Sequence, residues 1–399
     1  MLKGKTVVLA VTGGIAAYKI PNLARMLKKC GADVEVLMTK NATNFITPIT
    51  FESLTGHKCL VDTFDRNFEF SVEHVSIAKK ADLVLVAPAT ANVIGKIAGG
   101  IADDMLTTTV MACTCKTLVA PAMNHNMYHN PIVQDNIKKL ISYGYEIIAP
   151  DNGMLANGDM GDGRMPECDI LFQYILKELA FEKDLSGKKV LVTAGPTREA
   201  IDPVRYISNH STGKMGYAIA KNAMLRGADV TLVTGPVSLT PPMFVNVVNI
   251  ESAEDMYNAV TERANESDII IKAAAVADYK PKNVATEKIK KKDGDSIIDL
   301  DRTKDILKTL GELKASGKTK AFLCGFSMET ENMLENSKAK LKKKNVDMIV
   351  ANNLKVPGAG FGTDTNILTL ITEAETKELP IMDKEECAKM LLDFIKNKL

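Results

Sequence analysis

Two segments of this 399-residue chain have the pattern that opens a nucleotide-binding α/β domain. The first is KTVVLAVTGGIAAYK at 5–19, and the second is KKVLVTAGPTREAIDPVRYISNHSTGKMG at 188–216. In both segments a short apolar run ends at a glycine-containing turn, and a helical pattern follows. A doubly wound parallel sheet starts in this way, and ligands bind beside such turns. Two starts therefore predict two domains in one chain.

The segment between the two halves has the composition of a linker. It is FEKDLSG at 181–187, which is charged and ends in Ser-Gly. We therefore predict one domain at 1–182, a linker at 183–188 and a second domain at 189–399. Each domain is long enough to bury its own hydrophobic core.

Apolar runs and helical patterns alternate through both halves, which predicts an α/β fold with two doubly wound, Rossmann-like domains. The expected strands are 7–11, 33–38, 81–87, 118–120, 146–149, 188–193, 229–234, 245–250, 268–275, 321–326 and 348–351. The expected helices are 15–28, 45–54, 93–98, 101–113, 132–142, 168–180, 217–226, 253–264, 305–313, 331–344 and 384–396.

Three further segments lie outside these helices and strands. The stretch 153–164 contains four glycines, two aspartates and an arginine, and is expected to be a mobile loop of the kind used as a lid. A strand of a hairpin is expected at 296–300, and a closing hairpin at 366–371 and 377–380.

Charge and composition exclude several classes of protein. The formal net charge is +1, whereas a nucleic-acid-binding protein needs a strongly basic face. No apolar run reaches the roughly 18 residues needed to cross a bilayer, and the N-terminus lacks the features of a signal peptide. The seven cysteines are scattered and odd in number, so they do not suggest a disulfide framework. We expect a cytoplasmic protein that binds neither nucleic acid nor membrane.

Two histidines have a spacing found in metal sites. His125 and His129 lie four residues apart, a spacing that could mimic a pair of metal-ligating histidines. The sequence shows no third ligand for them, so the metal ligands of the chain are left unassigned.

The first half contains five elements that together indicate one family. They are GGIAAYK, His74, APATAN, PAMNHNMY and LANGDMGDGR. On these elements, residues 1–180 resemble the phosphopantothenoylcysteine decarboxylases, a family of flavin-dependent cysteine decarboxylases. The PxMNxxM motif discriminates most, because the glycines and APATAN would also suit related flavin prenyltransferases. The resemblance implies a flavodoxin-like domain with an FMN cofactor.

The resemblance also implies where FMN binds. Gly14 and Thr39 would approach its phosphate, and Ala89, Thr90 and Asn92 would approach its flavin ring. In this family FMN first oxidises the cysteine side chain to a thioaldehyde. Carbon dioxide can then leave into an enethiolate, and the reduced flavin returns the hydride.

Three further residues would act on the substrate. His74 would be the catalytic base or proton shuttle, since an imidazole titrates near neutrality. Asn124 would bind the substrate carboxylate through its amide. The best-known members have a cysteine in the loop sequence ACGD, where this chain has Asn157 in LANGD. An amide is not a proton donor of the same kind, so Asn157 is expected to be a substrate-loop residue and its acid role stays open.

The second half resembles the phosphopantothenate–cysteine ligase family over nearly its whole length. The elements are TAGPTREAIDPVRYISNHSTGKMG, AAAVADY, EKIKK and the strand end GFSMET. The family activates a carboxylate with a nucleoside triphosphate, CTP in the bacterial type. An acyl-cytidylate forms, pyrophosphate leaves, and the amine of cysteine attacks.

By this resemblance Asn209 would hold the acyl-cytidylate carbonyl and Arg205 would bind phosphopantothenate. A triphosphate needs cations, which Lys288, Lys340 and Lys344 would supply together with Mg²⁺. Further contacts with the nucleotide or its partner substrate are expected from Lys272, Ala273, Ala274, Asp278, Lys304, Asp305, Ile306, Leu307 and Phe326.

Together the two resemblances imply a bifunctional enzyme of coenzyme A synthesis that uses 4′-phosphopantothenate, cysteine and CTP. In the family the decarboxylase domains form trimers that group into dodecamers, and the ligase domains dimerise, so a homo-oligomer is implied. Two other classes stay open. One is a flavin prenyltransferase-like or NAD-dependent dehydrogenase-like enzyme, and the other is a non-enzymatic flavoprotein regulator.

Overall fold

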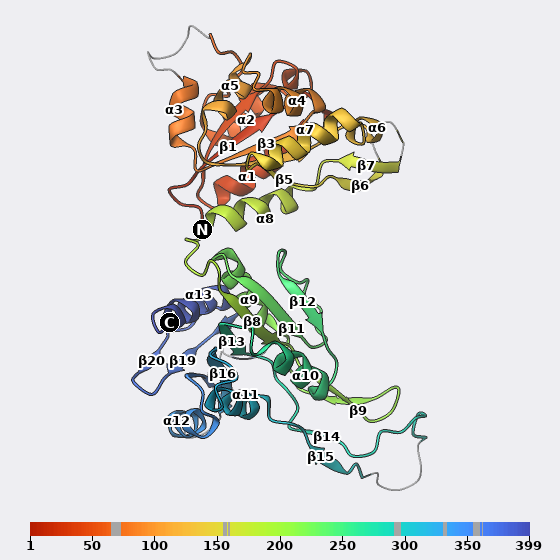
Figure 1. Ribbon diagram of the computed structural model, residues 1–399, viewed down its shortest axis with the longest axis vertical. Helices are drawn as coiled ribbons and strands as arrows, with labels where there is room; N and C mark the ends of the chain where they lie inside the picture. The colour runs from red at the N-terminus through yellow and green to blue at the C-terminus, as the bar shows by residue number, and fades with distance from the viewer. Residues whose placement is uncertain are drawn as a thin grey trace. The chain divides into compact units, whose positions relative to one another are not determined.

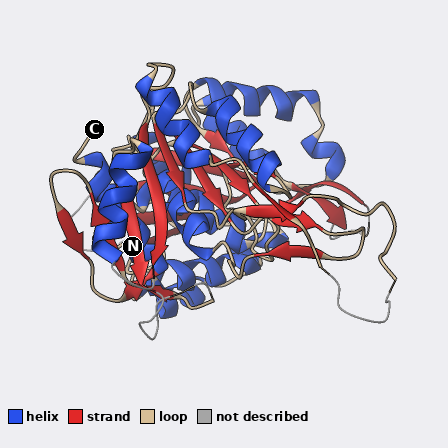
Figure 2. Ribbon diagram, turned by 90° about the horizontal axis from the view of Figure 1, so that it is seen from below, coloured by secondary structure: helices blue, strands red, loops and turns tan. Residues whose placement is uncertain are grey.

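The computed structural model describes residues 1–64, 73–154, 158, 160–290, 297–329, 333–353, 360 and 362–399. The chain divides into two compact units, unit 1 at Met1–Phe181 and unit 2 at Glu182–Leu399. Figure 1 labels most of the helices and many of the strands of both units, and Figure 2 colours helices blue and strands red. No helix in the described parts of the chain is long and apolar enough to span a bilayer.

Unit 1 is built on a parallel sheet with the strand order β2-β1-β3-β4-β5. Its strands are β1 (Thr6–Val11), β2 (Asp33–Met38), β3 (Leu83–Ala89), β4 (Lys116–Pro121) and β5 (Glu146–Ile147). The residues of β1 and β3 are all buried, as expected for central strands with helices on both faces. This order is that of flavodoxin, which confirms the predicted fold of the first half.

The helices of unit 1 include the six predicted ones with shifted bounds, and two that were not predicted, at Glu73–Lys80 and His125–Tyr128. They are α1 (Ile20–Lys29), α2 (Pro48–Thr55), α3 (Glu73–Lys80), α4 (Ala91–Gly99), α5 (Met105–Ala112), α6 (His125–Tyr128), α7 (Pro131–Ser142) and α8 (Cys168–Leu179), with short 3₁₀ turns at Ile15–Lys19 and Ala42–Asn44. The helix predicted at 15–28 is divided, because Pro21 has no N–H to continue α-helical bonding. The helix predicted at 101–113 begins at Met105, because Asp104 and Thr107 form a capping box.

The glycine-rich stretch predicted to be a loop forms an antiparallel pair in its described parts. Its strands are β6 (Asp151–Met154) and β7 (Met160–Arg164). Gly163 has φ 126°, and a Cβ there would lie 2.2 Å from the Met123 carbonyl oxygen. The Met123 N–H donates to the Gly163 carbonyl oxygen at 3.0 Å. The glycine therefore lets β7 approach the end of β4 through backbone contacts, which a hydrophobic pattern cannot reveal.

Unit 2 is built on an eight-stranded sheet with the order β12-β11-β8-β13-β16-β17-β19-β20. Its strands are β8 (Lys189–Ala194), β11 (Asp229–Thr234), β12 (Asn246–Asn249), β13 (Ile269–Lys272), β16 (Phe322–Glu329), β17 (Met348–Asn353), β19 (Leu368–Ile371) and β20 (Thr376–Glu378). The first six strands in this spatial order are parallel, and β19 and β20 are antiparallel. This is the Rossmann order 3-2-1-4-5-6 with an added antiparallel edge, which confirms the predicted fold class.

In the described part of unit 2, five helices flank this sheet, and the small strand pairs lie outside it. The helices are α9 (Lys214–Leu225), α10 (Ala253–Arg263), α11 (Ile306–Ala315), α12 (Met333–Lys344) and α13 (Lys384–Lys396). The pairs are β9 (Arg198–Ala200) with β10 (Tyr206–Ser208), β14 (Tyr279–Pro281) with β15 (Leu300–Arg302), and β18 (Thr365–Asn366) with β21 (Met382–Asp383). The strand predicted at 296–300 is therefore shifted, with its first residue outside the described chain.

Helix α13 packs against α9 and is held there by ion pairs. Lys221 Nζ lies 2.9 Å from Glu385 Oε1, and Arg226 Nη1 lies 2.8 Å from Asp393 Oδ1. Both bonds connect the first helix of unit 2 to its final helix, across more than 160 positions of sequence.

The segment predicted to be a linker packs on unit 2. Leu185 is buried, and Asp184 Oδ2 lies 2.6 Å from Arg226 Nη2 and 2.8 Å from Lys396 Nζ. Hydrogen bonds from Arg226 and Lys396 outweigh burial and lower the pKa of Asp184 to about 2. Residues 183–188 are thus part of the second unit, because Asp184 pairs with the buried guanidinium of Arg226.

Candidate active sites

Unit 1 contains a cavity of about 1310 Å³ at the carboxyl ends of its strands. Its lining comes largely from the segments that directly follow β1, β2, β3 and β4. The lining includes five residues that the sequence predicted for FMN or substrate, namely Gly14, Thr39, Thr90, Asn92 and Asn124. They meet because the carboxyl ends of parallel strands share one edge of the sheet.

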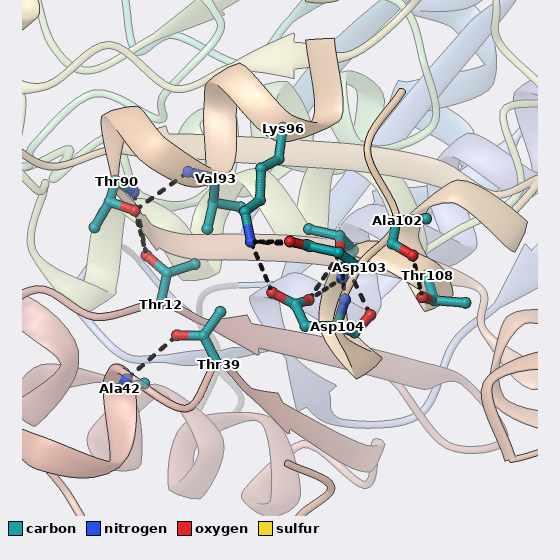
Figure 3. Close-up of polar contacts among 11 residues, drawn as sticks. Thr12, Thr39, Ala42, Thr90, Val93, Lys96, Ala102, Asp103, Asp104 and Thr108 are labelled. Atoms are coloured by element: carbon teal, nitrogen blue, oxygen red, sulfur yellow. Dashed lines mark hydrogen bonds and ion pairs between the residues drawn. The ribbon is translucent and has the colours of Figure 1, made fainter. Parts of the chain in front are cut away.

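Threonine hydroxyl groups fix the loops at this edge (Figure 3). Thr12 Oγ1 donates to the Pro88 carbonyl oxygen at 2.6 Å and accepts from the Thr90 N–H at 3.1 Å. Thr90 caps α4 by accepting from the Val93 N–H at 3.4 Å. Thr39 Oγ1 accepts from the Ala42 N–H at 3.2 Å. A hydroxyl that accepts in this way still has its own hydrogen to donate to an anionic ligand.

Two adjacent glycines serve different purposes at the first turn. A Cβ on Gly13 would lie 2.5 Å from Asn41 Cβ, so packing requires glycine at this position. A Cβ on Gly14 would have its nearest neighbour at 3.6 Å, in Thr90. Gly14 is therefore the glycine whose small size leaves space in the cavity.

Asn124 has its amide oriented by a helix cap. Its Oδ1 accepts from the Asn126 N–H at 2.9 Å, at the start of α6. Because the cap uses the amide oxygen, the NH₂ group is the end that can serve a ligand. Asn124 lines the cavity and can donate to a carboxylate there.

The sequence analysis missed a charged group in the lining. Lys96, Asp103 and Asp104 all line the cavity. Lys96 Nζ lies 2.7 Å from Asp103 Oδ1 and 3.5 Å from Asp104 Oδ2 (Figure 3). The hydrogen bond between Lys96 and Asp103 raises the pKa of Lys96 and lowers the pKa of Asp103. Lys96 follows Asn92 by one helical turn, and that spacing could have indicated it.

Three predicted residues of unit 1 do not appear in the described lining. Ala89 is fully buried in β3, and its carbonyl oxygen accepts from the Ala122 N–H at 2.9 Å. Only the backbone of Ala89 can therefore approach a ligand. His74 is half-buried on α3, and it is not among the described residues that line the cavity. Asn157 lies outside the described residues.

Unit 2 contains a cluster of charged side chains around the carboxyl end of β13. Lys272 is the last residue of this strand, and desolvation by burial lowers the pKa of its amine. The charges that act on it are the carboxylates of Asp305 and Asp278 and the amines of Lys340 and Lys344. Five of the residues predicted from the sequence thus lie within one electrostatic cluster, which we call the lysine cluster.

Asp305 connects two helices of the lysine cluster. Its carboxylate caps α11 by accepting from the Lys308 N–H at 2.9 Å, and it forms an ion pair with Lys344 on α12. Burial alone raises the pKa of Asp305, but these two bonds outweigh it and hold the pKa below its ordinary value. Lys340 donates to Ser327 Oγ on β16 at 3.1 Å. Ser327 directly follows the half-buried Phe326 in the chain.

The loop that follows β13 is held by two side chains. The Ala274 N–H donates to the buried Thr193 Oγ1 at 3.1 Å. Asn209 Nδ2 donates to the Ala275 carbonyl oxygen at 2.9 Å. Ala273 lies within the same loop. Asn209, predicted to act on the acyl group, is therefore attached to the loop that follows Lys272.

Arg205 and Lys288 are connected through a buried aspartate. Arg205 Nε and Nη2 donate to Asp202 Oδ2 at 3.0 and 2.6 Å, and the Ile289 N–H donates to the same oxygen at 3.1 Å. These bonds hold the pKa of Asp202 well below its ordinary value, although desolvation opposes them. Arg205 also lines a cavity of about 560 Å³. The exposed Lys288 precedes Ile289, so its segment is fastened to Arg205.

Three predicted contacts of unit 2 have limited access to a ligand. Lys304 turns toward α10, with Nζ 2.6 Å from Glu254 Oε1 and 4.6 Å from the centroid of the Tyr257 ring. Ile306 and Leu307 are buried in the hydrophobic core of unit 2. Only the backbone of these two residues can reach a nucleotide, because their side chains fill the core.

Two family models match the chain. "Flavoprotein" matches residues 1–180, and "DNA/pantothenate metabolism flavoprotein C-terminal domain" matches residues 185–399. The chain is 48% identical over 399 residues to the coenzyme A biosynthesis bifunctional protein CoaBC of Bacillus subtilis (strain 168), covering 99% of this chain and 97% of that protein. It is 44% identical over 403 residues to the protein of the same name from Vibrio vulnificus (strain YJ016), covering 99% and 98%.

Among solved structures, a crystal structure of the C-terminal domain of CoaBC is similar, with 45% identity and a TM-score of 0.47, covering 54% of this chain and 98% of that one. The full-length matches extend over both units. They do not favour a prenyltransferase, a dehydrogenase or a non-enzymatic regulator. The chain belongs to the family of the coenzyme A biosynthesis bifunctional protein CoaBC.

Proposed function

We propose that unit 2 joins cysteine to 4′-phosphopantothenate with CTP, through an acyl-cytidylate. Unit 1 then decarboxylates the product to 4′-phosphopantetheine with FMN. The observation that supports this most is the contrast between two sites in one chain of this family. One is a roomy cavity whose lining includes the hydroxyl and amide groups of Thr39, Thr90, Asn92 and Asn124, and the other is the lysine cluster. A planar flavin suits the first, and a triphosphate suits the second.

The cavity of unit 1 has room for a cofactor together with a substrate. Its volume of about 1310 Å³ exceeds the roughly 300–1,000 Å³ of ordinary small-molecule sites. Gly14 and the Thr39 hydroxyl would hold the FMN phosphate, while Thr90, Asn92 and the backbone of Ala89 would contact the flavin. When bound, FMN supplies the reversible oxidation that lets carbon dioxide leave the cysteine portion of the substrate.

The amide of Asn124 would hold the substrate carboxylate that is lost. Its NH₂ group is the free end of the amide, because Oδ1 caps α6. Asn157 would contact the substrate from its loop. We expect Asn157→Ala to slow turnover or to release an oxidised dead-end product, and wild-type rate and product distribution would exclude this role.

His74 would move a proton in the decarboxylation, but it does not line the described cavity of its own chain. We propose that α3 of a neighbouring copy brings His74 to the site in a homo-oligomer of trimers grouped into dodecamers. Mixing inactive His74→Asn and inactive Asn124→Asp chains during refolding should restore part of the decarboxylase activity. If the mixed oligomers stay inactive, a shared site is excluded.

In unit 2, Lys340 and Lys344 would neutralise the triphosphate together with Mg²⁺ and Lys288. Asp278, Asp305, Phe326 and backbone groups of 272–274 and 304–307 would contact the rest of the nucleotide. Arg205 would bind phosphopantothenate, and two copies of unit 2 would dimerise. We also propose that the enzyme works in the cytoplasm, which agrees with seven free cysteines.

One incubation tests the whole proposal. The full chain is supplied with 4′-phosphopantothenate, cysteine, CTP and Mg²⁺, and both carbon dioxide and 4′-phosphopantetheine should form. Asn209→Asp should still release pyrophosphate in forming the acyl-cytidylate but should pass the acyl group to cysteine poorly. Normal cysteine ligation by this variant would refute the role of Asn209.

A further inference from the structure

Three side chains capable of binding a metal converge between α6 and β7 of unit 1. They are His125, His129 and Asp162, and their ligand atoms all lie within 4.8 Å of one another. None of the three is among the described residues that line the large cavity, although their neighbours Asn124 and Gly163 are. The group is therefore distinct from the flavin site and adjacent to it in the chain.

The atoms are already close to the spacing of a metal site. His129 Nε2 lies 3.0 Å from Asp162 Oδ2. The two imidazole rings have centroids 4.4 Å apart and planes inclined at 59°. With zinc–ligand bonds of about 2.0–2.1 Å, two ligand atoms of a tetrahedral ion lie roughly 3.3 Å apart. Small side-chain movements would therefore be enough to place an ion between the three groups.

A neighbouring amide orients the carboxylate toward the histidines. Asn152 Nδ2 donates to Asp162 Oδ1 at 2.9 Å, which leaves Oδ2 to face His129. Ligands of metal ions are commonly fixed by such outer contacts. His125 presents Nδ1 toward Asp162, where it accepts from the Asp162 N–H at 3.2 Å. Ligation through Nδ1 would exchange this hydrogen bond for the metal.

We propose that His125, His129 and Asp162 bind one divalent transition-metal ion, Zn²⁺ in the first instance, and thereby fasten β7 to α6. Two imidazoles and one carboxylate form a ligand set that Zn²⁺ accepts, with a fourth position for water. The side chains of His129 and Asp162 are 48% and 37% exposed, so an ion can reach them from solvent. Such a clamp would fix the strand that supplies Gly163 and Arg164 to the cavity.

A second group with metal-binding chemistry provides the comparison. Asp33, Glu35 and His57 also place their ligand atoms within 4.8 Å. There, however, Lys80 Nζ lies 2.7 Å from both Asp33 Oδ2 and Glu35 Oε1. The lysine ammonium already occupies the position of a cation, so we do not assign an ion to this group.

The test uses the full chain, freed of metal with EDTA and then titrated with ZnCl₂ alone by calorimetry. We expect one Zn²⁺ per chain to bind at this site. His129→Gln and Asp162→Asn, which preserve size and polarity, should each weaken that binding at least about tenfold. His57→Gln should bind Zn²⁺ as the wild type does.

Two further readouts separate the site from other sources of binding. Co²⁺ in place of Zn²⁺ should show the spectrum of nitrogen and oxygen ligands, without thiolate absorption from the C-x-C pair Cys113 and Cys115, which precedes β4. Bound Zn²⁺ should slow amide hydrogen exchange in 160–164 of the wild type but not of His129→Gln. Absence of binding by the wild type, equal binding by His129→Gln and Asp162→Asn, or a purely thiolate spectrum would overturn the site. Unchanged exchange in the zinc-loaded wild type would overturn the clamp.

Discussion

Units 1 and 2 place a buried threonine at the same point of their folds. Thr12 follows β1 and accepts from the Thr90 N–H in the loop after β3, while Thr193 lies near the end of β8 and accepts from the Ala274 N–H in the loop after β13. In each sheet these two strands are neighbours at the point where the strand order reverses. A crevice opens at that point in doubly wound sheets, so the threonine holds the loop that forms one wall of the crevice.

The side chains around the two crevices differ in charge. In unit 1, Lys96 is paired with Asp103 and Asp104, and the ligands that the sequence predicted in the lining are uncharged. The lining also includes charged residues of both signs that were not predicted as ligands, namely Lys19, Lys40, Asp62 and Arg164. In unit 2, two aspartates and two further lysines act electrostatically on Lys272. The comparison teaches that this fold sets where a ligand binds, whereas a few side chains at the edge set which ligand it is.

Of the variants considered, Lys340→Ala should have the largest effect on one activity while leaving the other unchanged. Removing one cation from a triphosphate site should lower ligation about 10²–10³-fold, by analogy with other preorganised charges. Decarboxylation of supplied phosphopantothenoylcysteine should be unchanged, because that step belongs to unit 1. Lys343→Ala, an exposed lysine of the same helix, is the control and should ligate normally. Equal loss of both activities in Lys340→Ala would break the comparison.

Asn124→Asp should have the opposite effect, with loss of decarboxylation and retention of ligation. The new carboxylate can still cap α6, but it would repel the substrate carboxylate, so decarboxylation should fall by roughly 10²-fold while ligation continues. Asn130→Asp is the matched control, since Asn130 Oδ1 caps α7 by accepting from the Ile132 N–H at 3.0 Å. Rates of carbon dioxide release measure the difference. Similar rates in the two variants would remove Asn124 from the site.

Thr12 and Thr193 can be tested for an equivalent structural role in the two units. Thr12→Val and Thr193→Val each leave buried backbone groups without a partner, so each should lower the free energy of unfolding by about 1–3 kcal/mol. Thr12→Val should also weaken FMN binding, and Thr193→Val should weaken nucleotide binding. Denaturant unfolding and ligand titration measure both effects. If only one variant loses stability, the two threonines are not equivalent.

The smallest effect should be a pH dependence confined to unit 2. The pKa of Asp184 is lowered from 3.8 to about 2, so its ionised form stabilises the fold. This contribution is complete above about pH 4 and is lost as the pH falls toward 2. Asp184→Asn should therefore lower stability at pH 7 by at most about 2 kcal/mol and flatten the acid dependence. Asp135→Asn in unit 1, at an exposed ion pair, should change neither.

Much of the fold could be predicted because long elements have strong periods. The strands at 33–38 and 229–234 and the helix at 384–396 have the bounds that the pattern predicts. The pair β9 and β10 was missed, because two three-residue strands contain too few residues for a period. The pairing of β6 with β7 was missed because glycine and aspartate disfavour strands, and backbone bonds decide the outcome there.

The candidate sites were predictable where residues directly follow strands. Thr39 and Thr90 could be placed on one edge, since parallel strands end together. Asp162, the third ligand of the proposed metal site, could not be predicted from the sequence. It is 33 residues from His129, and only the path of the chain through β6 and β7 brings the two together. The ion pair between Lys304 and Glu254 could not be predicted either, since it depends on how α10 packs.

The ion pairs between α9 and α13 have a consequence for synthesis on the ribosome. The N-terminal half emerges first and can fold while the second half is still being made. In the second half, α9 cannot pack against α13 until residues 384–396 have left the exit tunnel. Until then Lys221 and Arg226 lack their partners Glu385 and Asp393 on that helix. A nascent chain that stalls before this helix would therefore display a finished flavin domain joined to an unfinished ligase, which exposes only the later half to chaperones and proteases.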